Sequence, residues 1–241
     1  MSSNDELIEA FINDMDTELS IRKKELYLIK EILDSITNIP NKFTIIRNTV
    51  PSLYAHYEGF LKFSFQKLIE TIKSMDIDNS DINKKFLIMC LVTNLEDHIS
   101  SQKSKSKVLI SNFDKIYKNN DNILNVTKLD KYILNHDTLD QTCEILGIDL
   151  DKILIDKQNF REFPKAELGI LYARRNEIAH GDISTSNQFS ISKQKDITNG
   201  QVSFAYKNWV ENYNCVLGAL DLIKNMFIDY LMNEHYLDKV I

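Results

Sequence analysis

The sequence predicts an all-α protein, and three observations support this prediction. Only 6 glycines and 3 prolines occur among 241 residues, whereas β-sandwiches and barrels need many turns that consume both residue types. Long stretches repeat their apolar residues at helical spacing. With 43% hydrophobic and 27% charged residues, the chain can bury a core of useful size. We therefore expect a bundle of long antiparallel helices.

The N-terminal part of the chain predicts two long helices. Apolar residues recur at helical spacing from Asn4 to Ile36, and Pro40 is expected to mark the break that follows. A second helix is expected from Phe43 to Met75. At Pro51 this helix either kinks or restarts, and a restart would use Thr49 as its cap.

The middle of the chain has a less regular pattern. A third helix is expected from Ile82 to Ile99, and a loop-like stretch rich in Ser and Lys follows it. Short helices are expected at Val108–Tyr117 and Thr138–Leu146. An insertion into the bundle would lie at about 100–163, and residues 1–241 otherwise form a single domain.

Two further helices are expected in the C-terminal part. Pro164 suits the first turn of a helix that reaches His180 and stops at Gly181. Residues 182–200 are polar and predict an exposed loop. The last helix is expected from Val202 to Tyr236.

Charge and cysteine content exclude several classes of protein. There are 29 Lys and Arg residues against 35 Asp and Glu, and the net charge of −6 argues against a protein that coats nucleic acid. The three cysteines are far apart, so we expect no zinc knuckle and no disulfide framework. We also expect no cofactor. Since there is no signal-peptide pattern and no apolar run of membrane-spanning length, we expect a cytoplasmic protein without a membrane partner.

One segment carries most of the functional information. Residues 175–180 read Arg-Asn-Glu-Ile-Ala-His, which has the form R-N-x-x-x-H, and Gly181 follows. This segment resembles the signature of the HEPN superfamily (higher eukaryotes and prokaryotes nucleotide-binding domains). A second segment, residues 53–60 (LYAHYEGF), is similar to a YAH-aromatic-EGF stretch of one prokaryotic HEPN subfamily. The resemblance implies a HEPN-like helical bundle.

The resemblance also implies a function. Many members are dimeric, metal-independent endoribonucleases of toxin and defence systems. We therefore expect RNA cleavage by 2′-hydroxyl attack, in a bacterial toxin or anti-phage defence setting. A homodimer with a composite site is implied, and an antitoxin or another defence-system protein is a candidate partner. The alternative is a non-catalytic HEPN-like module that binds nucleotide, RNA or a protein partner, and a plain dimerising scaffold is a third reading.

The residue types of this segment suit phosphate chemistry. The Arg175 guanidinium matches phosphate oxygens, and the partial negative charge of a helix C-terminus should raise the pKa of His180 into the range of a general acid or base. Asn176 lies four residues before His180, so it can fix a ring tautomer or bind a phosphate oxygen. Arg174 is the rival phosphate ligand, or else it forms only a surface pair with Glu177.

Supporting residues are expected on the second helix. Arg47, Tyr54 and Glu58 are spaced at i, i+7 and i+11, so they share one helix face. Glu58 or Tyr54 would line the cleft and orient Arg175 or His180. The alternative is that Glu58 forms a structural pair, for example with Arg47 or Arg175.

Other side chains are weaker candidates. Lys193 and Lys195 lie in the loop that follows the motif and are candidates for RNA contact, although a solvated loop is the alternative. His56 is expected to be a packing or surface histidine. Trp209 could belong to the core or to an interface.

Overall fold

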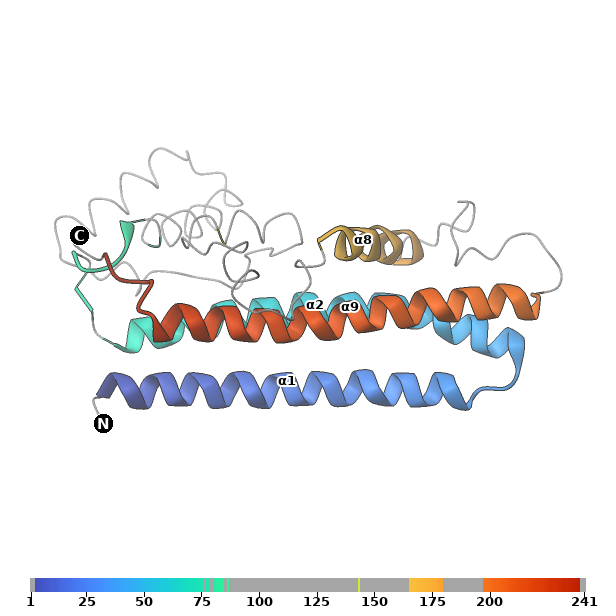
Figure 1. The fold of residues 1–241 in the computed structure, drawn as a ribbon, viewed down its shortest axis with the longest axis horizontal. Coiled ribbons are helices and arrows are strands. Elements are labelled where there is room, and N and C mark those ends of the chain that lie inside the picture. Colours follow the sequence, from blue (N-terminus) through green and yellow to red (C-terminus); the bar gives the residue numbers. More distant parts are fainter. Residues whose placement is uncertain are drawn as a thin grey trace, which may run out of the picture. The chain divides into compact units, whose positions relative to one another are not determined.

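The structure is a computed structural model (Figure 1). The described residues are 3–75, 77–78, 80–84, 86, 143, 165–179 and 197–238. They contain four helices: α1 (Ser3–Ser35), α2 (Ile39–Ser74), α8 (Lys165–Ala179) and α9 (Asn199–Met232). Within the described residues the only extended pairing is an isolated bridge between Ile82 and Leu237. The predicted all-α fold class is therefore confirmed.

The first two helices match the prediction closely, except at their junction. α1 ends at Ser35 and α2 begins at Ile39. The sequence predicts that Pro40 marks the break between the two helices. In the structure, Pro40 lies in the first turn of α2. A proline is tolerated there because the first N–H groups of a helix have no intrahelical partner.

α2 continues as one helix through Pro51, so of the two alternatives at this proline, a kink or a restart, the restart is wrong. The Thr49 hydroxyl does not cap a new helix. It donates instead to the backbone oxygens of Ile45 and Ile46 at 2.9 and 3.0 Å. Back-bonding of this kind is typical of threonine inside a helix.

Both ends of α9 have well-defined caps. At the start, Gln201 N donates to Thr198 Oγ1 at 3.3 Å and Thr198 N donates to Gln201 Oε1 at 2.9 Å, which is a capping box. At the other end, Glu234 has a φ of 54°. Glu234 N donates to Leu231 O and His235 N donates to Tyr230 O, both at 3.1 Å, which is a Schellman motif. The helix therefore ends at Met232, four residues before the predicted Tyr236.

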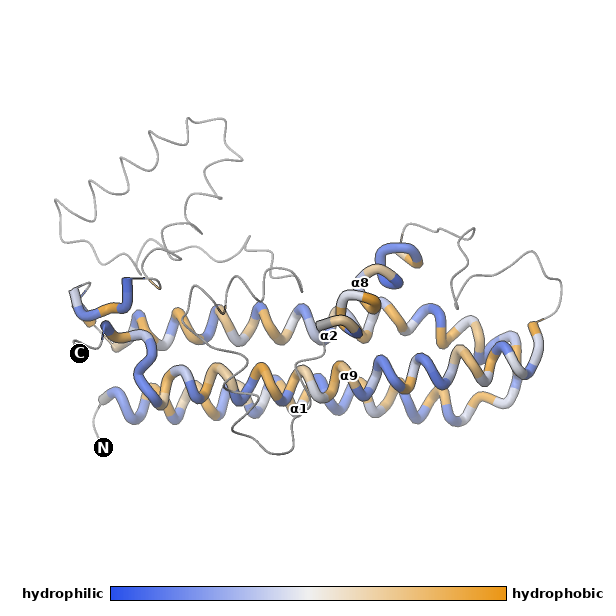
Figure 2. The backbone as a smooth tube through the Cα atoms, turned by 45° about the horizontal axis from the view of Figure 1, so that its top comes forward, coloured by the Kyte–Doolittle hydropathy of each residue, from blue (hydrophilic) through white to orange (hydrophobic). Residues whose placement is uncertain are grey.

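The chain divides into two compact units. The first comprises Met1–Asp14, Phe63–Asp156 and Asn225–Ile241, and the second comprises Met15–Lys62 and Lys157–Lys224. Each long helix contributes residues to both units. Hydropathy alternates along these helices, so each presents an apolar side and a polar side (Figure 2).

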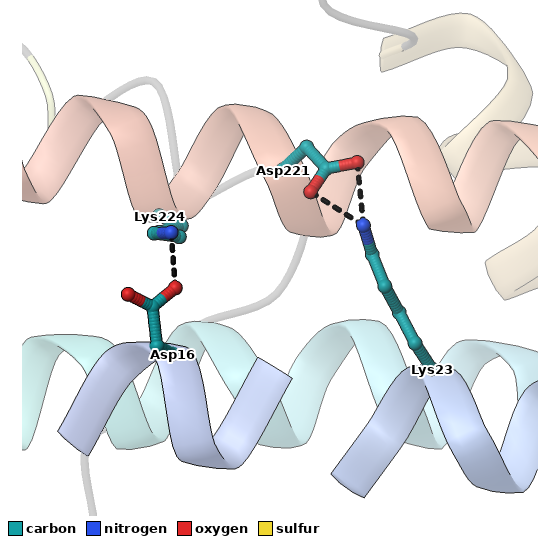
Figure 3. Close-up of polar contacts among 4 residues, drawn as sticks. All are labelled: Asp16, Lys23, Asp221 and Lys224. Carbon is teal, nitrogen blue, oxygen red and sulfur yellow. Dashed lines mark hydrogen bonds and ion pairs between the residues drawn. The ribbon is translucent and has the colours of Figure 1, made fainter. Parts of the chain in front are cut away.

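In the second unit, α1 packs against α2 and α9. Figure 3 shows two ion pairs between α1 and α9 whose polarity is opposite. Lys23 Nζ donates to both carboxylate oxygens of Asp221 at 2.6 and 2.8 Å, and Lys224 Nζ bonds to Asp16. α1 runs antiparallel to α9 and α2, whereas α2 and α9 run in the same direction (Figure 1).

Aromatic packing builds part of this core. Trp209 is fully buried, so the core alternative for this residue is correct. Its indole stacks between Tyr206 and Tyr213, at centroid distances of 6.5 and 5.3 Å. The Tyr206 hydroxyl donates to Asp34 of α1, and the Lys42 ammonium lies 4.6 Å above the Tyr206 ring. These contacts join α9 to α1 and α2.

In the first unit, the end of α9 packs on α2. The Phe65 and Phe227 rings meet edge to face at 6.3 Å. After α9, Asp238 N donates to Asp81 O and Asn83 N donates to Tyr236 O, both at 2.8 Å. These bonds fix the segment that follows the helix.

Several predictions fall outside the described residues. They are the helices expected at Val108–Tyr117 and Thr138–Leu146, most of the helix at Ile82–Ile99, and, apart from Cys143, the insertion at about 100–163. Within the described ranges, none of the helices combines the length and apolar character that crossing a bilayer requires.

Candidate functional site

α8 carries the arginine-rich part of the motif in the second unit. Leu168 and Leu171 are fully buried and anchor the helix. The Tyr172 ring lies 5.3 Å from the ring of Tyr54 on α2. Tyr54 is itself buried, at 1% exposure. The predicted supporting residue Tyr54 therefore contacts the helix that carries the motif, two residues before Arg174.

Arg175 and Asn176 are joined by a hydrogen bond near the C-terminal end of α8. Arg175 Nη1 donates to Asn176 Oδ1 at 2.7 Å, and both residues are half-buried. Because the amide oxygen is occupied, Asn176 Nδ2 remains as a donor for a further group. The bond uses one of the five guanidinium donors of Arg175, so the others can bind the oxygens of an anion.

Arg174 has a different environment. It is half-buried, and this burial lowers its pKa, while the charges of Glu177 and Glu211 act in the opposite direction. Since Glu211 belongs to α9, the Arg174 side chain lies within electrostatic range of that helix. Arg174 and Glu177 interact, as one alternative from the sequence held, but both residues are partly buried and the pair is not fully solvated.

Glu177 has an unusual acceptor atom. Its Oε2 is buried and has no hydrogen-bond partner within the described part of the chain. From the sequence, Glu177 is expected only as a partner of Arg174. Its spacing gave no sign of a buried carboxylate oxygen, because burial depends on how α8 packs on the neighbouring helices.

Glu58 has a local partner. Lys62 Nζ donates to Glu58 Oε1 at 2.8 Å, one helical turn away on α2. Glu58 therefore forms a structural pair, as one of the two alternatives held, but its partner is Lys62, whereas the sequence suggested Arg47 or Arg175. Arg47 is half-buried on the same helix.

The segment at residues 53–60 packs against α1. Arg22 Nη1 donates to His56 O at 3.2 Å, and the His56 ring nitrogen lies 3.7 Å from Glu25 Oε2. His56 is 9% exposed, and desolvation by this burial lowers its pKa. His56 is therefore a packing histidine, as expected. The role of Arg22 is not predicted by the sequence, since no local sequence pattern indicates which residue of α1 contacts this segment.

Three predicted site residues lie outside the described residues. α8 ends at Ala179, and His180 follows directly in the sequence. Lys193 and Lys195 belong to the stretch between α8 and α9. The structure therefore brings together Arg175 and Asn176, whereas the position of His180 beside them remains an expectation from the sequence.

The described cysteines are poor nucleophiles. Cys143 is buried, and its Sγ lies 3.7 Å from Met226 Sδ. Burial, with a smaller contribution from Glu167, raises the pKa of the Cys215 thiol to about 12. Such a thiol stays protonated at neutral pH. Across the described ranges, no three His, Cys, Asp or Glu side chains are grouped so that they could hold a metal ion.

Comparison with known proteins adds one match. The model of the RiboL-PSP-HEPN family matches residues 17–228, which is well over half of the chain and includes α2, α8, the R-N-x-x-x-H segment and most of α1 and α9. Neither a curated protein nor a solved structure matches the chain. The all-helical architecture agrees with the family match. On this basis the chain belongs to the RiboL-PSP-HEPN family and thus to the HEPN superfamily.

Proposed function

We propose that this protein is a metal-independent endoribonuclease that acts in the cytoplasm, in a bacterial toxin or anti-phage defence setting. The observation that carries the proposal is the hydrogen-bonded pair of Arg175 and Asn176 at the end of α8, directly before His180 in the sequence. Membership of a HEPN family supports it.

The three residues can supply the groups that RNA cleavage needs. RNA carries its own nucleophile, the 2′-hydroxyl. The 2′-oxygen forms a bond to phosphorus while its proton passes to a base, and the P–O5′ bond breaks as the 5′-oxygen receives a proton. The products end in a 2′,3′-cyclic phosphate and a 5′-hydroxyl, and no metal takes part.

Each residue has a role in this scheme. Arg175 stabilises the negative charge that builds up on the phosphate oxygens, because its free donors form a fork that fits them. Asn176 Nδ2 binds a phosphate oxygen or orients the imidazole. His180 transfers a proton as general acid or base. Arg175 is the better phosphate ligand, because Arg174 is drawn toward Glu177 and Glu211.

Two proton transfers need two titrating groups, and each chain supplies one motif histidine. We propose that two protomers pack with both Arg/His sets facing one cleft, so that each protomer provides one of the two histidines. An antitoxin or another defence-system protein would hold the activity in check. A size measurement that finds only monomer at working concentration would rule out the composite site.

The proposal is tested by RNA cleavage in the presence of EDTA. The wild-type protein should produce fragments with 2′,3′-cyclic phosphate ends, and His180→Ala should not. His235→Ala is the matched control, since this histidine is 48% exposed and lies in the other unit. Fragments that carry only 3′-hydroxyl ends would contradict the mechanism. RNA binding without fragments would favour a non-catalytic binding module instead.

A further inference from the structure

Phe204 is an exposed aromatic residue near the start of α9. Its side chain is 55% exposed, whereas most other aromatic residues of this helix are buried. An exposed phenylalanine ring contributes little to the free energy of folding, because this contribution comes from removing apolar surface from solvent. Single exposed apolar residues are common, so exposure alone does not indicate a binding role for Phe204. Its position relative to α8 provides the argument.

Phe204 lies on the side of α9 that faces α8. Glu211 and Cys215 follow it by 7 and 11 residues, so the three residues form one stripe along the helix. Glu211 acts electrostatically on Arg174, and Glu167 acts on Cys215. Both interactions link this stripe to α8, so its later part lies within electrostatic range of that helix.

The same two interactions give the relative direction of the helices. Glu167 lies near the later residue Cys215, and Arg174 lies near the earlier residue Glu211, so α8 runs antiparallel to α9. The C-terminal end of α8 therefore points toward the N-terminal part of α9, which extends beyond it (Figure 1). Phe204 lies two turns before Glu211, about 10 Å along the axis, in the direction in which Arg175 and Asn176 follow Arg174.

A positive charge accompanies the ring. Lys207 is one turn away on the same side of α9, is exposed, and forms no ion pair with any described residue. Asn208 Nδ2 donates to Phe204 O at 2.9 Å, so this polar side chain folds back on its own helix and leaves the ring open. An exposed ring beside an exposed cation suits a nucleotide, which offers a flat base and a phosphate.

We propose that Phe204 and Lys207 form a subsite for one nucleotide of a single-stranded RNA, next to the scissile phosphate. The Phe204 ring stacks on the base, and the Lys207 ammonium binds the phosphate of that nucleotide. Stacking tolerates any base, so this subsite contributes affinity without sequence preference. The assignment of RNA as the ligand rests on the ribonuclease function proposed above.

The test measures RNA binding separately from cleavage. A fluorescein-labelled single-stranded oligoribonucleotide of mixed sequence is titrated with full-length His180→Ala protein, and the dissociation constant is read from anisotropy. Adding Phe204→Ala should weaken binding about tenfold, whereas Phe204→Trp should preserve it. Adding Lys207→Ala should lower the dependence of binding on salt by about one phosphate contact. Ile32→Ala is the matched control, because Ile32 is 56% exposed on α1.

Base stacking makes a further prediction that general loss of structure would not reproduce. When the stacked base is replaced by an abasic site, Phe204→Ala should weaken binding no further. Equal affinity of Phe204→Ala and its parent for intact RNA would overturn the subsite, and so would a complete lack of RNA binding by the parent.

The two proposals can fail independently. If the wild-type protein yields no fragments but binding depends on Phe204, the nuclease proposal fails and the subsite remains. If the wild-type protein cleaves RNA and Phe204→Ala changes neither Kd nor KM, the subsite fails and the nuclease remains.

Discussion

Gly59 on α2 leaves the space that the Arg22 guanidinium of α1 occupies. A Cβ atom at position 59 would lie 2.7 Å from Arg22 Nη1. The same nitrogen donates to His56 O, and Arg22 Nη2 pairs with Glu18 Oε1 at 2.6 Å. The glycine of the segment at residues 53–60 therefore permits a close contact between two helices.

The first prediction concerns this contact. Gly59→Ala should destabilise the wild-type protein or leave it unchanged, because the new methyl group displaces Arg22 and offsets the gain in helix propensity. In an Arg22→Ala background the same change should stabilise by about 1 kcal/mol, which is the ordinary difference between Gly and Ala in a helix. Urea unfolding of the four proteins gives the coupling energy.

Gly218→Ala on α9 is the control for this cycle. Its added Cβ would meet nothing within 4 Å, so the substitution should stabilise the wild-type protein by about 1 kcal/mol. Equal effects of Gly59→Ala with and without Arg22 would show that the close contact does not constrain the helix pair.

The second prediction concerns the end of α9. Glu234 adopts a φ of 54°, a conformation that costs a residue with a side chain about 1 kcal/mol relative to glycine. Glu234→Gly should therefore raise the free energy of unfolding by up to about 1 kcal/mol, measured by urea denaturation. Asp229→Gly, within the same helix, should lower it. A lower stability of Glu234→Gly would contradict the Schellman cap.

The third prediction tests the ion pair of Lys23 and Asp221. Reversal of either charge should destabilise the protein by about 0.5–1 kcal/mol, because the pair is partly exposed and its energy is modest. The double reversal, Lys23→Asp with Asp221→Lys, should recover most of the loss. The coupling should shrink as salt is added. Additive effects of the two changes at low salt would mean that the pair contributes nothing.

The fourth prediction is a pH dependence caused by His56. Burial lowers its pKa in the folded state below the ordinary value of 6.5. Between the two pKa values the unfolded chain binds more protons, so stability falls as the pH drops below about 6.5. The unfolding free energy of the wild type should therefore fall more steeply between about pH 7 and pH 5 than that of His56→Gln. Parallel curves for the two proteins would exclude this contribution.

The fifth prediction separates the two arginines of α8. Arg175→Ala should reduce RNA cleavage by about 100-fold or more while leaving the unfolding free energy nearly unchanged, since its proposed role is to stabilise charge in the transition state. Arg174→Ala should lower stability by about 1 kcal/mol, because the substitution removes a partly buried side chain that interacts with Glu177 and with Glu211 of α9. The reverse pattern would make Arg174 the phosphate ligand.

The sequence predicts the long helices well because their apolar residues repeat at helical spacing. The prediction fails where a local signal has two meanings: Pro40 suggests a break between helices but lies in the first turn of α2. It also fails at the end of α9, where Glu234 and not a glycine adopts the left-handed conformation, so the usual signal for a helix end is missing. The pair of Glu58 and Lys62 is predicted by the i, i+4 spacing only when a partner on the same helix is considered before a partner on another helix.

Contacts between helices are the part of the site that the sequence does not predict. The R-N-x-x-x-H pattern singles out Arg175 and Asn176, and the hydrogen bond between them follows from adjacency. The burial of Arg174 and its relation to Glu211 depend on how α8 crosses α9, and no local pattern encodes that crossing.

The pairing of α1 with α9 has a consequence for synthesis on the ribosome. Asp16 and Lys224 are separated by 208 positions, and Lys23 and Asp221 by 198. The side of α1 that packs against α9 thus stays uncovered until α9 has been made, and contacts of such long range form slowly. A translation product that stops before Asn199 lacks α9, so the Arg/Asn pair of α8 has no complete scaffold until this helix has been made.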